Sequence, residues 1–221
     1  MVLNIENLTF GWQQETLFEN ISGHLNQKEI VQLSGENGSG KTTLLQIISG
    51  MIPHFSRGEI LSGEVLINGR SILKVPPKSF FPAIAFIPST NLDFFLLTEL
   101  LAQEILITKS ILKIKNKLVQ KRREEFSDFF PDIIEFINAP FKTLQFNQKI
   151  EALTFIFYLQ NAQLYLFDEV MAGFSQSAIQ RWYSFFKWLG SKGCTILFVD
   201  HHQQAKGFAH WLLKDKNLVK L

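Results

Sequence analysis

The sequence contains a single cysteine, Cys194, among its 221 residues. An intrachain disulfide is therefore excluded, and a reducing compartment is expected. An excess of one charge is also absent, because 22 lysines and arginines are offset by 20 acidic residues and the formal net charge is only +2. Without a strong basic field, nucleic acid is not an expected partner.

Long apolar runs are missing as well. No uninterrupted run approaches the roughly 20 residues of a membrane-spanning helix. The first ten residues lack the basic and apolar regions of a signal peptide, so none is expected. The longest runs, Phe80–Pro88 and Ala152–Leu159, have the length of buried strands or core helix segments. We therefore expect a soluble chain that can still dock on a membrane protein.

Hydrophobic residues are nevertheless abundant, at 46% of the chain, and 22 of them are phenylalanines. This amount suffices for one large domain, or for one domain with an inserted lobe. Most of the phenylalanines are expected in the core, and a minority on a docking surface.

Strand and helix patterns alternate along the chain, which favours an α/β fold with a helical insert. Periodicity and flanking turn residues predict a helix at Thr42–Ser49, ended by Gly50, and a helical stretch from about Leu92 to Asn138. The basic residues of that stretch are expected to form a solvated face rather than a lipid or nucleic-acid contact. The predicted strands are Val2–Phe10, Glu29–Leu33, Glu64–Ile67, Ala83–Ile87, Gln163–Phe167 and Thr195–Val199.

A phosphate-binding motif follows the second predicted strand, because Gly35-Glu36-Asn37-Gly38-Ser39-Gly40-Lys41-Thr42 fits G-x-x-x-x-G-K-[ST]. Glycines let backbone N–H groups converge on phosphate oxygens, and the next helix directs its positive end to the same anion. Lys41 can reach the β- and γ-phosphates, and the Thr42 hydroxyl can bind Mg²⁺. The alternative is a glycine-rich turn with an exposed lysine, which the strand-to-helix context argues against. The residues expected to bind nucleotide here are Gly35, Asn37, Gly38, Ser39, Gly40, Lys41, Thr42 and Thr43.

Two further groups of polar residues follow apolar strands. Asp168 and Glu169 directly follow the apolar run Leu164–Phe167, at the end of a strand where ligands bind. Asp168 can hold Mg²⁺ through water, and Glu169 can polarise the water that attacks a phosphate. By themselves two acids suit a solvated turn, but together with the phosphate loop the functional interpretation is favoured. His201, just after Thr195–Val199, can contact a γ-phosphate. The alternatives are a surface histidine pair or a chance metal-like pair, and no further His/Cys cluster supports a zinc site.

The order of these motifs resembles the ABC ATPase family over nearly the whole chain. The resemblance implies a single α/β P-loop NTPase domain over residues 1–221, with a RecA-like, mostly parallel sheet, an N-terminal antiparallel β subdomain and an inserted α-helical subdomain at roughly residues 90–160. It also implies that Trp12 stacks on adenine, that Thr42 and Asp168 hold Mg²⁺, and that Lys41, Glu169 and the switch histidine His201 are catalytic.

Within the family, two segments resemble the ATPases of energy-coupling-factor importers of vitamins and metal ions. These are the segments Gly50–Phe55 and Ser62–Gly69. The resemblance implies an importer.

Three positions depart from the family pattern. The signature L-S-G-G-Q is replaced by Leu144-Gln145-Phe146-Asn147-Gln148, so the small groups that cap the other subunit's γ-phosphate are lost. Ser89 stands at the glutamine of the Q-loop, and Ser175 stands at the aspartate of the D-loop. The residues expected to hold and cleave this chain's own ATP are retained, whereas the residues that would contact the ATP of a partner subunit are altered. This pattern favours an asymmetric heterodimer of ATPases over a homodimer with two impaired sites.

The resemblance therefore predicts an ATPase that uses ATP and Mg²⁺, sits peripherally on the cytoplasmic face of the membrane, and works with an integral membrane transporter subunit. The contact would lie in the insert Leu92–Phe136, where Phe94 and Phe95 are either docking or core residues. One alternative is an ATP-binding module that does not hydrolyse. An ABC-type protein of DNA maintenance is disfavoured by the lack of long coiled coils. A kinase-type enzyme would need a second substrate pocket and lid arginines, which the sequence does not reveal.

Overall fold

A computed structural model describes residues 1–12, 15–56, 58–200, 205 and 207–221. Its N-terminal part is a four-stranded antiparallel sheet in the order β2-β1-β4-β5. The predicted strand at residues 2–10 is confirmed, and the strand predicted at Glu64–Ile67 is longer than expected. The turn at Asn68-Gly69 connects it to β5. The strands are β1 (Leu3–Trp12), β2 (Glu15–Leu25), β4 (Glu59–Ile67) and β5 (Arg70–Ser71).

A six-stranded sheet forms the centre of the molecule, in the order β10-β9-β3-β8-β7-β6. Its strands pair in parallel except for β10 at the edge, which pairs antiparallel with β9. All residues of β6, β7 and β8 are buried, as expected for parallel strands covered on both faces. The strands are β3 (Ile30–Gly35), β6 (Ile84–Ile87), β7 (Leu164–Asp168), β8 (Thr195–Val199), β9 (Ala209–Lys214) and β10 (Asn217–Lys220).

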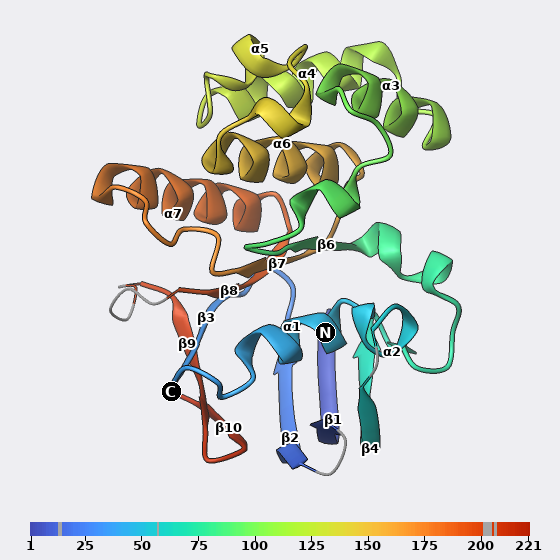
Figure 1. The fold of residues 1–221 in the computed structure, drawn as a ribbon, viewed down its shortest axis with the longest axis vertical. Helices are drawn as coiled ribbons and strands as arrows, with labels where there is room; N and C mark the ends of the chain where they lie inside the picture. Colours follow the sequence, from blue (N-terminus) through green and yellow to red (C-terminus); the bar gives the residue numbers. More distant parts are fainter. Residues whose placement is uncertain (13–14, 57, 201–204, 206) are drawn as a thin grey trace.

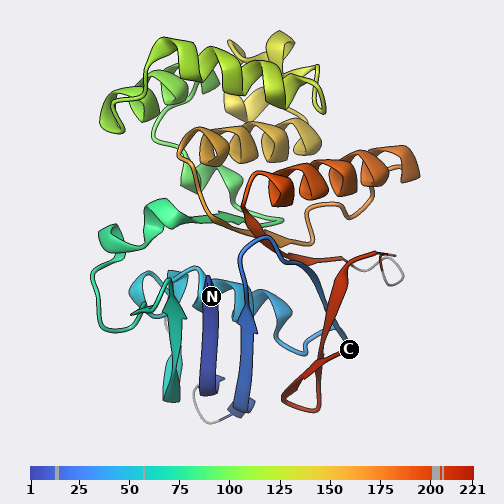
Figure 2. The same ribbon diagram turned by 180° about the vertical axis from the view of Figure 1, so that it is seen from behind.

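Helices cover both faces of this central sheet (Figure 1). On one side lie α6 and α7, with α3, α4 and α5 stacked beyond them; on the other side lie α1 and the antiparallel sheet, as the reverse view in Figure 2 also shows. The α-helices are α1 (Lys41–Ile48), α2 (Met51–His54), α3 (Leu101–Ile111), α4 (Asn116–Ser127), α5 (Ile133–Phe136), α6 (Phe146–Leu159) and α7 (Gln176–Ser191). Short 3₁₀ helices are η1 (Pro77–Ser79), η2 (Phe81–Ala83), η3 (Leu92–Phe95) and η4 (Phe141–Thr143).

Two hydrophobic clusters hold these layers together, one on each face of the central sheet. The cluster beneath α6 and α7 is rich in aromatic side chains, which explains much of the phenylalanine content. The Phe126 ring from α4 lies 5.1 Å from that of Phe155 on α6 and 5.3 Å from that of Phe185 on α7. These contacts hold α4 against α6 and α7, since such aromatic pairs add to the free energy of burial.

Several sequence predictions need adjustment. The run Ala152–Leu159, left open between strand and helix, is the second half of α6. The stretch 92–138 is helical but broken into four pieces. Most basic residues of the lobe are exposed, as expected, whereas Lys109, Arg122 and Lys149 are half-buried. Four strands, β2, β5, β9 and β10, were not among the predicted strands. Among the residues that the structure describes, no helix is long and apolar enough to cross a membrane.

Candidate functional site

The glycine-rich loop lies between β3 and α1, at the carboxyl edge of the central sheet. Gly38 and Gly40 have φ angles of 81° and 98°, in the region that side chains disfavour. A Cβ on Gly40 would come within 2.7 Å of the Phe18 ring, a buried residue of β2. The antiparallel sheet therefore packs against the loop so closely that this position requires glycine.

Lys41 turns its side chain back over this loop. Its Nζ donates hydrogen bonds to the carbonyl oxygens of Gly35, at 3.0 Å, and Glu36, at 3.1 Å. The residue is 5% exposed, which is unusual for a lysine. A positive charge is thus held within the loop, where it can meet an anion.

The start of α1 is also suited to an anion. Gly40 is its N-cap and provides no side-chain cap, so no side chain occupies the first amide groups of the helix. The Ser39 hydroxyl is buried and has no hydrogen-bond partner among the described residues. A phosphate in the loop would give both kinds of donor a partner, so the residues fit such a group.

Thr42 and Asp168 meet across the sheet edge. The Thr42 Oγ1 donates a hydrogen bond of 3.0 Å to the Asp168 Oδ1. Asp168 ends β7 and is only 2% exposed, whereas Thr42, in the first turn of α1, is exposed. A hydroxyl and a carboxylate at this distance are oxygen ligands that suit Mg²⁺.

Glu169 follows directly in a strained conformation, with a φ angle of 54°. Its backbone N–H donates to the Val199 carbonyl of β8 at 3.2 Å, which carries the sheet pairing one residue further. A non-glycine residue in this region costs free energy and often marks a functional position. Glu169 is half-buried at the edge where Thr42 and Asp168 meet.

Trp12 ends β1 with 39% of its surface exposed. Its ring stands edge-to-face on Phe10, with centroids 5.2 Å apart and planes at 89°. Because Phe10 is fully buried, this contact holds one side of the Trp12 ring against the protein. Stacking of Trp12 on adenine remains a prediction.

His201 lies outside the described residues. Hydrogen bonds hold Asp200 and Ala205, the described residues on either side of its segment. The Asp200 carboxylate is buried and accepts a hydrogen bond from the Tyr183 hydroxyl of α7 at 2.8 Å. Burial, and then this carboxylate, raise the pKa of Tyr183. Gln32 on β3 accepts from the Ala205 backbone N–H at 2.7 Å and donates to the Asp200 carbonyl at 3.5 Å.

Gln32 is therefore a residue that the sequence analysis missed. It is 1% exposed and sits in the strand that enters the phosphate loop. The available signal was a polar side chain within an apolar strand. Such a residue is normally buried only with hydrogen-bond partners.

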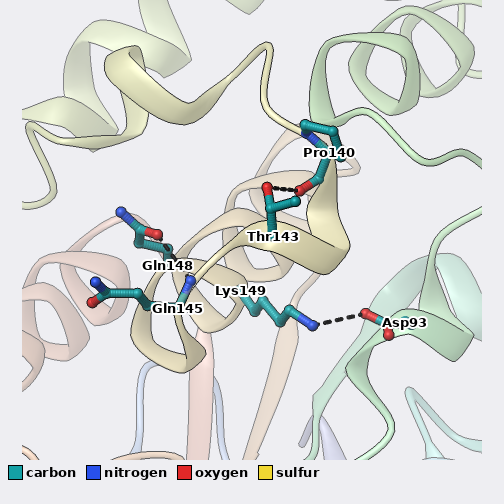
Figure 3. Close-up of polar contacts among 6 residues, drawn as sticks. All are labelled: Asp93, Pro140, Thr143, Gln145, Gln148 and Lys149. Carbon is teal, nitrogen blue, oxygen red and sulfur yellow. Dashed lines mark hydrogen bonds and ion pairs between the residues drawn. The ribbon is translucent and has the colours of Figure 1, made fainter.

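The segment at the place of the signature begins α6, as Figure 3 shows. Gln145 is the N-cap, and its side chain accepts from the backbone N–H of Gln148. In return the Gln148 Oε1 accepts from the Gln145 N–H at 3.0 Å, which completes a capping box. Lys149 forms an ion pair with Asp93 at 3.3 Å beside it. Side chains thus satisfy amides that would otherwise be free for a phosphate.

The remaining members of this segment surround that cap. Leu144 is buried, Asn147 is exposed, and Phe146 is 39% exposed with its ring 6.4 Å from that of Phe174. Ser175, at the D-loop position, caps α7 by accepting from the Ala178 N–H at 3.3 Å. Ser89 is half-buried, two residues after β6.

An apolar cavity of about 370 Å³ opens between α2, the edge strand β6 and α3. Phe95 lines it, whereas the side chain of Phe94 lies outside the described part. The buried Glu104 carboxylate shapes one wall by accepting from the N–H groups of Leu97, at 2.9 Å, and Thr98, at 3.1 Å. Apolar side chains around it are strongly exposed, namely Phe55, Leu97 and Ile111.

Comparison with known proteins agrees with this geometry. The family described as ABC transporter matches residues 18–172. A putative ABC transporter ATP-binding protein of Bacillus thuringiensis is 28% identical over 201 residues, which are 90% of this chain and 34% of that protein. The chain thus spans about a third of the length of that relative. The cytochrome c biogenesis ATP-binding export protein CcmA of Reclinomonas americana is 30% identical over 171 residues, covering 77% of this chain and 72% of CcmA.

Solved structures share the fold at lower identity. An ATP-binding subunit of an ABC transporter superposes with a TM-score of 0.84 at 21% identity, covering 100% of this chain and 90% of that one. The cbiO1 protein of Clostridium perfringens, part of the transporter complex cbiONQ, gives 0.80 at 18% identity, covering 99% of this chain and 86% of that one. These likenesses confirm the α/β fold with its antiparallel and mostly parallel sheets.

Proposed function

Because this chain belongs to the ABC transporter family, we propose that it binds MgATP at the Gly35–Thr43 loop and hydrolyses it to drive a membrane-spanning partner. Residues 1–221 would form one ATPase domain, with the helical lobe at roughly 90–160 as an insert. Its place would be the cytoplasmic face of the membrane, held there by the partner.

The observation that carries this proposal is the hydrogen bond between Thr42 and Asp168. Both oxygens would serve Mg²⁺, Asp168 through a water, and the ion would neutralise phosphate charge when it is bound. Lys41 would move from the loop carbonyls to the β- and γ-phosphates, and Trp12 would stack on the adenine. Glu169 would orient and polarise the attacking water, and His201 would contact the γ-phosphate.

Calorimetric titration with MgATP tests the binding step. Lys41→Ala is expected to abolish measurable binding, whereas Lys117→Ala, at an exposed position of α4, should leave it unchanged. Glu169→Gln should keep ATP bound and abolish hydrolysis in a single-turnover assay. Equal binding by wild type and Lys41→Ala would refute a nucleotide site in this loop.

We propose that the membrane partner docks at the apolar cavity that Phe95 lines. The support is the exposure of two apolar side chains at this cavity, Leu97 at 76% and Ile111 at 66%. Monomeric proteins seldom expose large apolar patches of this kind. Glu104 keeps this wall in shape. We further propose an energy-coupling-factor type of importer, from the Gly50–Phe55 and Ser62–Gly69 segments. The fold likeness to cbiO1 agrees with that type, whereas the name of CcmA refers to export.

We propose a second ATPase subunit as the other partner, in a heterodimer. The support is the capping box of Gln145 and Gln148, which occupies the start of α6, together with the exposed ring of Phe146. This surface would serve a partner's ATP poorly. Vigorous steady-state hydrolysis by the purified chain alone, abolished by Glu169→Gln, would remove the need for a different partner.

The same observation favours a second candidate function, an ATP-binding subunit that holds a complex together without hydrolysis. Ser89 in place of the Q-loop glutamine points the same way, because its hydroxyl is too short to reach both Mg²⁺ and the attacking water. Asp168 and Glu169 count against it. Single-turnover hydrolysis of bound ATP in the presence of the natural partners distinguishes the two functions.

A further inference from the structure

A second cavity, of about 470 Å³, lies between the first turns of α6 and α7, which run side by side in both views (Figures 1 and 2). The turn of residues 172–175 closes one side of it. Its wall combines aromatic and charged side chains, including Phe146, Glu151, Phe174, Arg181 and Trp182.

Glu151 is the unusual member of this wall. It is only 7% exposed, and no hydrogen bond or ion pair links its carboxyl group to another residue in the described part of the chain. Burial raises the pKa of Glu151 to about 7, the nearby Asp132 carboxylate raises it as well, and the Arg181 guanidinium lowers it. A buried carboxylate without a partner is costly, so this position calls for a group that is not supplied by the described chain.

The surroundings favour a positive group. Arg181 is itself exposed and forms no ion pair with Glu151, so it offsets the charge of this acid only in part. The positive field of a helix N-terminus fades within the first turn, and Glu151 lies in the second turn of α6. Phe146 and Phe174 line the same cavity, and aromatic rings attract cations to their faces.

We propose that this cavity receives one basic side chain, a guanidinium or an ammonium group, from the second ATPase subunit, and that this group pairs with Glu151. The inference rests on the proposed function for the identity of the partner, because the cavity adjoins the α6 start assigned above to the subunit interface. Glu151 would then select the partner by charge, since a neutral or acidic side chain at that place would leave the carboxylate buried and unpaired.

The cation site can be tested without nucleotide, by NMR on the full chain with ¹³C-labelled glutamate carboxyl groups. The probe is n-propylguanidinium, and neutral n-propylurea of the same shape is its control. We expect a saturable shift of the Glu151 signal and a fall of at least one unit in its pKa with the cation alone. Equal effects of the urea, or no saturation, would overturn the site.

Matched variants make the test specific. Glu151→Gln should weaken binding of n-propylguanidinium at least tenfold, whereas Glu135→Gln, an exposed position of α5, should not. An undiminished affinity in Glu151→Gln would show that the cation binds elsewhere and would overturn the proposal.

A third measurement addresses the source of the cation. Light scattering over a range of concentrations is expected to show that the isolated chain does not self-associate through Glu151. A dimer that forms in wild type and is lost in Glu151→Gln would identify a second copy as the occupant and overturn the choice of a different ATPase. Calorimetry with MgATP on the same samples separates this outcome from failure of the proposed function, in which the wild type would bind no ATP.

Discussion

Thr42 and Asp168 are 126 positions apart in the chain, yet the hydroxyl of one donates to the carboxylate of the other at 3.0 Å. Strands β3 and β7 are separated by β8, and both end at the same edge of the sheet. This edge is where ligands bind in parallel sheets. The contact places an acid beside the phosphate loop and determines the predictions for Mg²⁺.

Removing the Thr42 hydroxyl or the negative charge of Asp168 should weaken the binding of Mg²⁺ beside the loop. We expect Thr42→Val and Asp168→Asn to lower the affinity for MgATP about 10–100-fold, the range found when groups that support a metal are lost. Thr42→Ser keeps the hydroxyl and should stay close to wild type. The measurement is calorimetric titration with and without Mg²⁺. Unchanged Mg²⁺ dependence in Thr42→Val would contradict a metal site at this pair.

Gly40 and Gly38 offer a matched comparison within the phosphate loop. Both have positive φ, but a Cβ would meet the Phe18 ring only at Gly40, whereas nothing lies within 4 Å at Gly38. Gly40→Ala should therefore lower the free energy of unfolding by about 2–4 kcal/mol, from backbone strain and overpacking together. Gly38→Ala should cost only about 1–2 kcal/mol. Urea denaturation measures both values, and equal losses would argue against a clash with Phe18.

Gln32→Met should loosen the attachment of Ala205 to β3, because methionine fills a similar volume but can neither accept from Ala205 nor donate to Asp200. We expect amide hydrogen exchange at Ala205 to accelerate and the free energy of unfolding to fall by about 1–3 kcal/mol. Gln180→Met on the exposed side of α7 is the control. Unaltered exchange at Ala205 would mean that its hydrogen bond to Gln32 does not stabilise this segment.

Glu151 should make stability depend on pH. Its pKa rises from 4.5 when unfolded to about 7 when folded, so between these values the folded chain holds the additional proton. The free energy of unfolding is then expected to fall as pH increases from about 4.5 to 7, by at most about 3 kcal/mol. Glu151→Gln should remove this slope and be the more stable protein at pH 8, whereas Glu135→Gln should keep it. Parallel pH profiles of wild type and Glu151→Gln would contradict the raised pKa.

Arg122 should be important for the helical lobe. Its guanidinium donates to the carbonyls of Tyr158 and Leu159, at 3.0 and 2.7 Å, and to the Asn161 side chain at 2.9 Å, which caps the end of α6 before β7. We expect Arg122→Met to lower the free energy of unfolding by about 2–3 kcal/mol, because buried carbonyls lose a charged donor. Arg123→Met, at an exposed neighbour, should change it by less than about 0.5 kcal/mol. Similar losses in the two variants would exclude this cap.

Local patterns predicted part of the fold well. The buried strands at 163–167 and 195–199 and the helix after the phosphate loop were confirmed to within a residue or two, because apolar runs and glycine stops are local signals. Strands β9 and β10 were missed because His210, Lys214 and Asn217 interrupt any apolar run there. The role of Gln145 was missed too, since its loss of a small hydroxyl gave no sign that it caps α6 together with Gln148.

The sequence by itself determined the phosphate loop, its glycines and the acids at the end of β7, because contiguous residues and their backbone preferences define each of these. Only the tertiary structure decided which of them meet. The order of the parallel strands brings Asp168 to Thr42, and Gln32 to both Asp200 and Ala205. The packing of α6 beside α7 likewise leaves Glu151 buried in a cavity without a partner in the described chain. Such relationships depend on distances between remote segments, which no local pattern records.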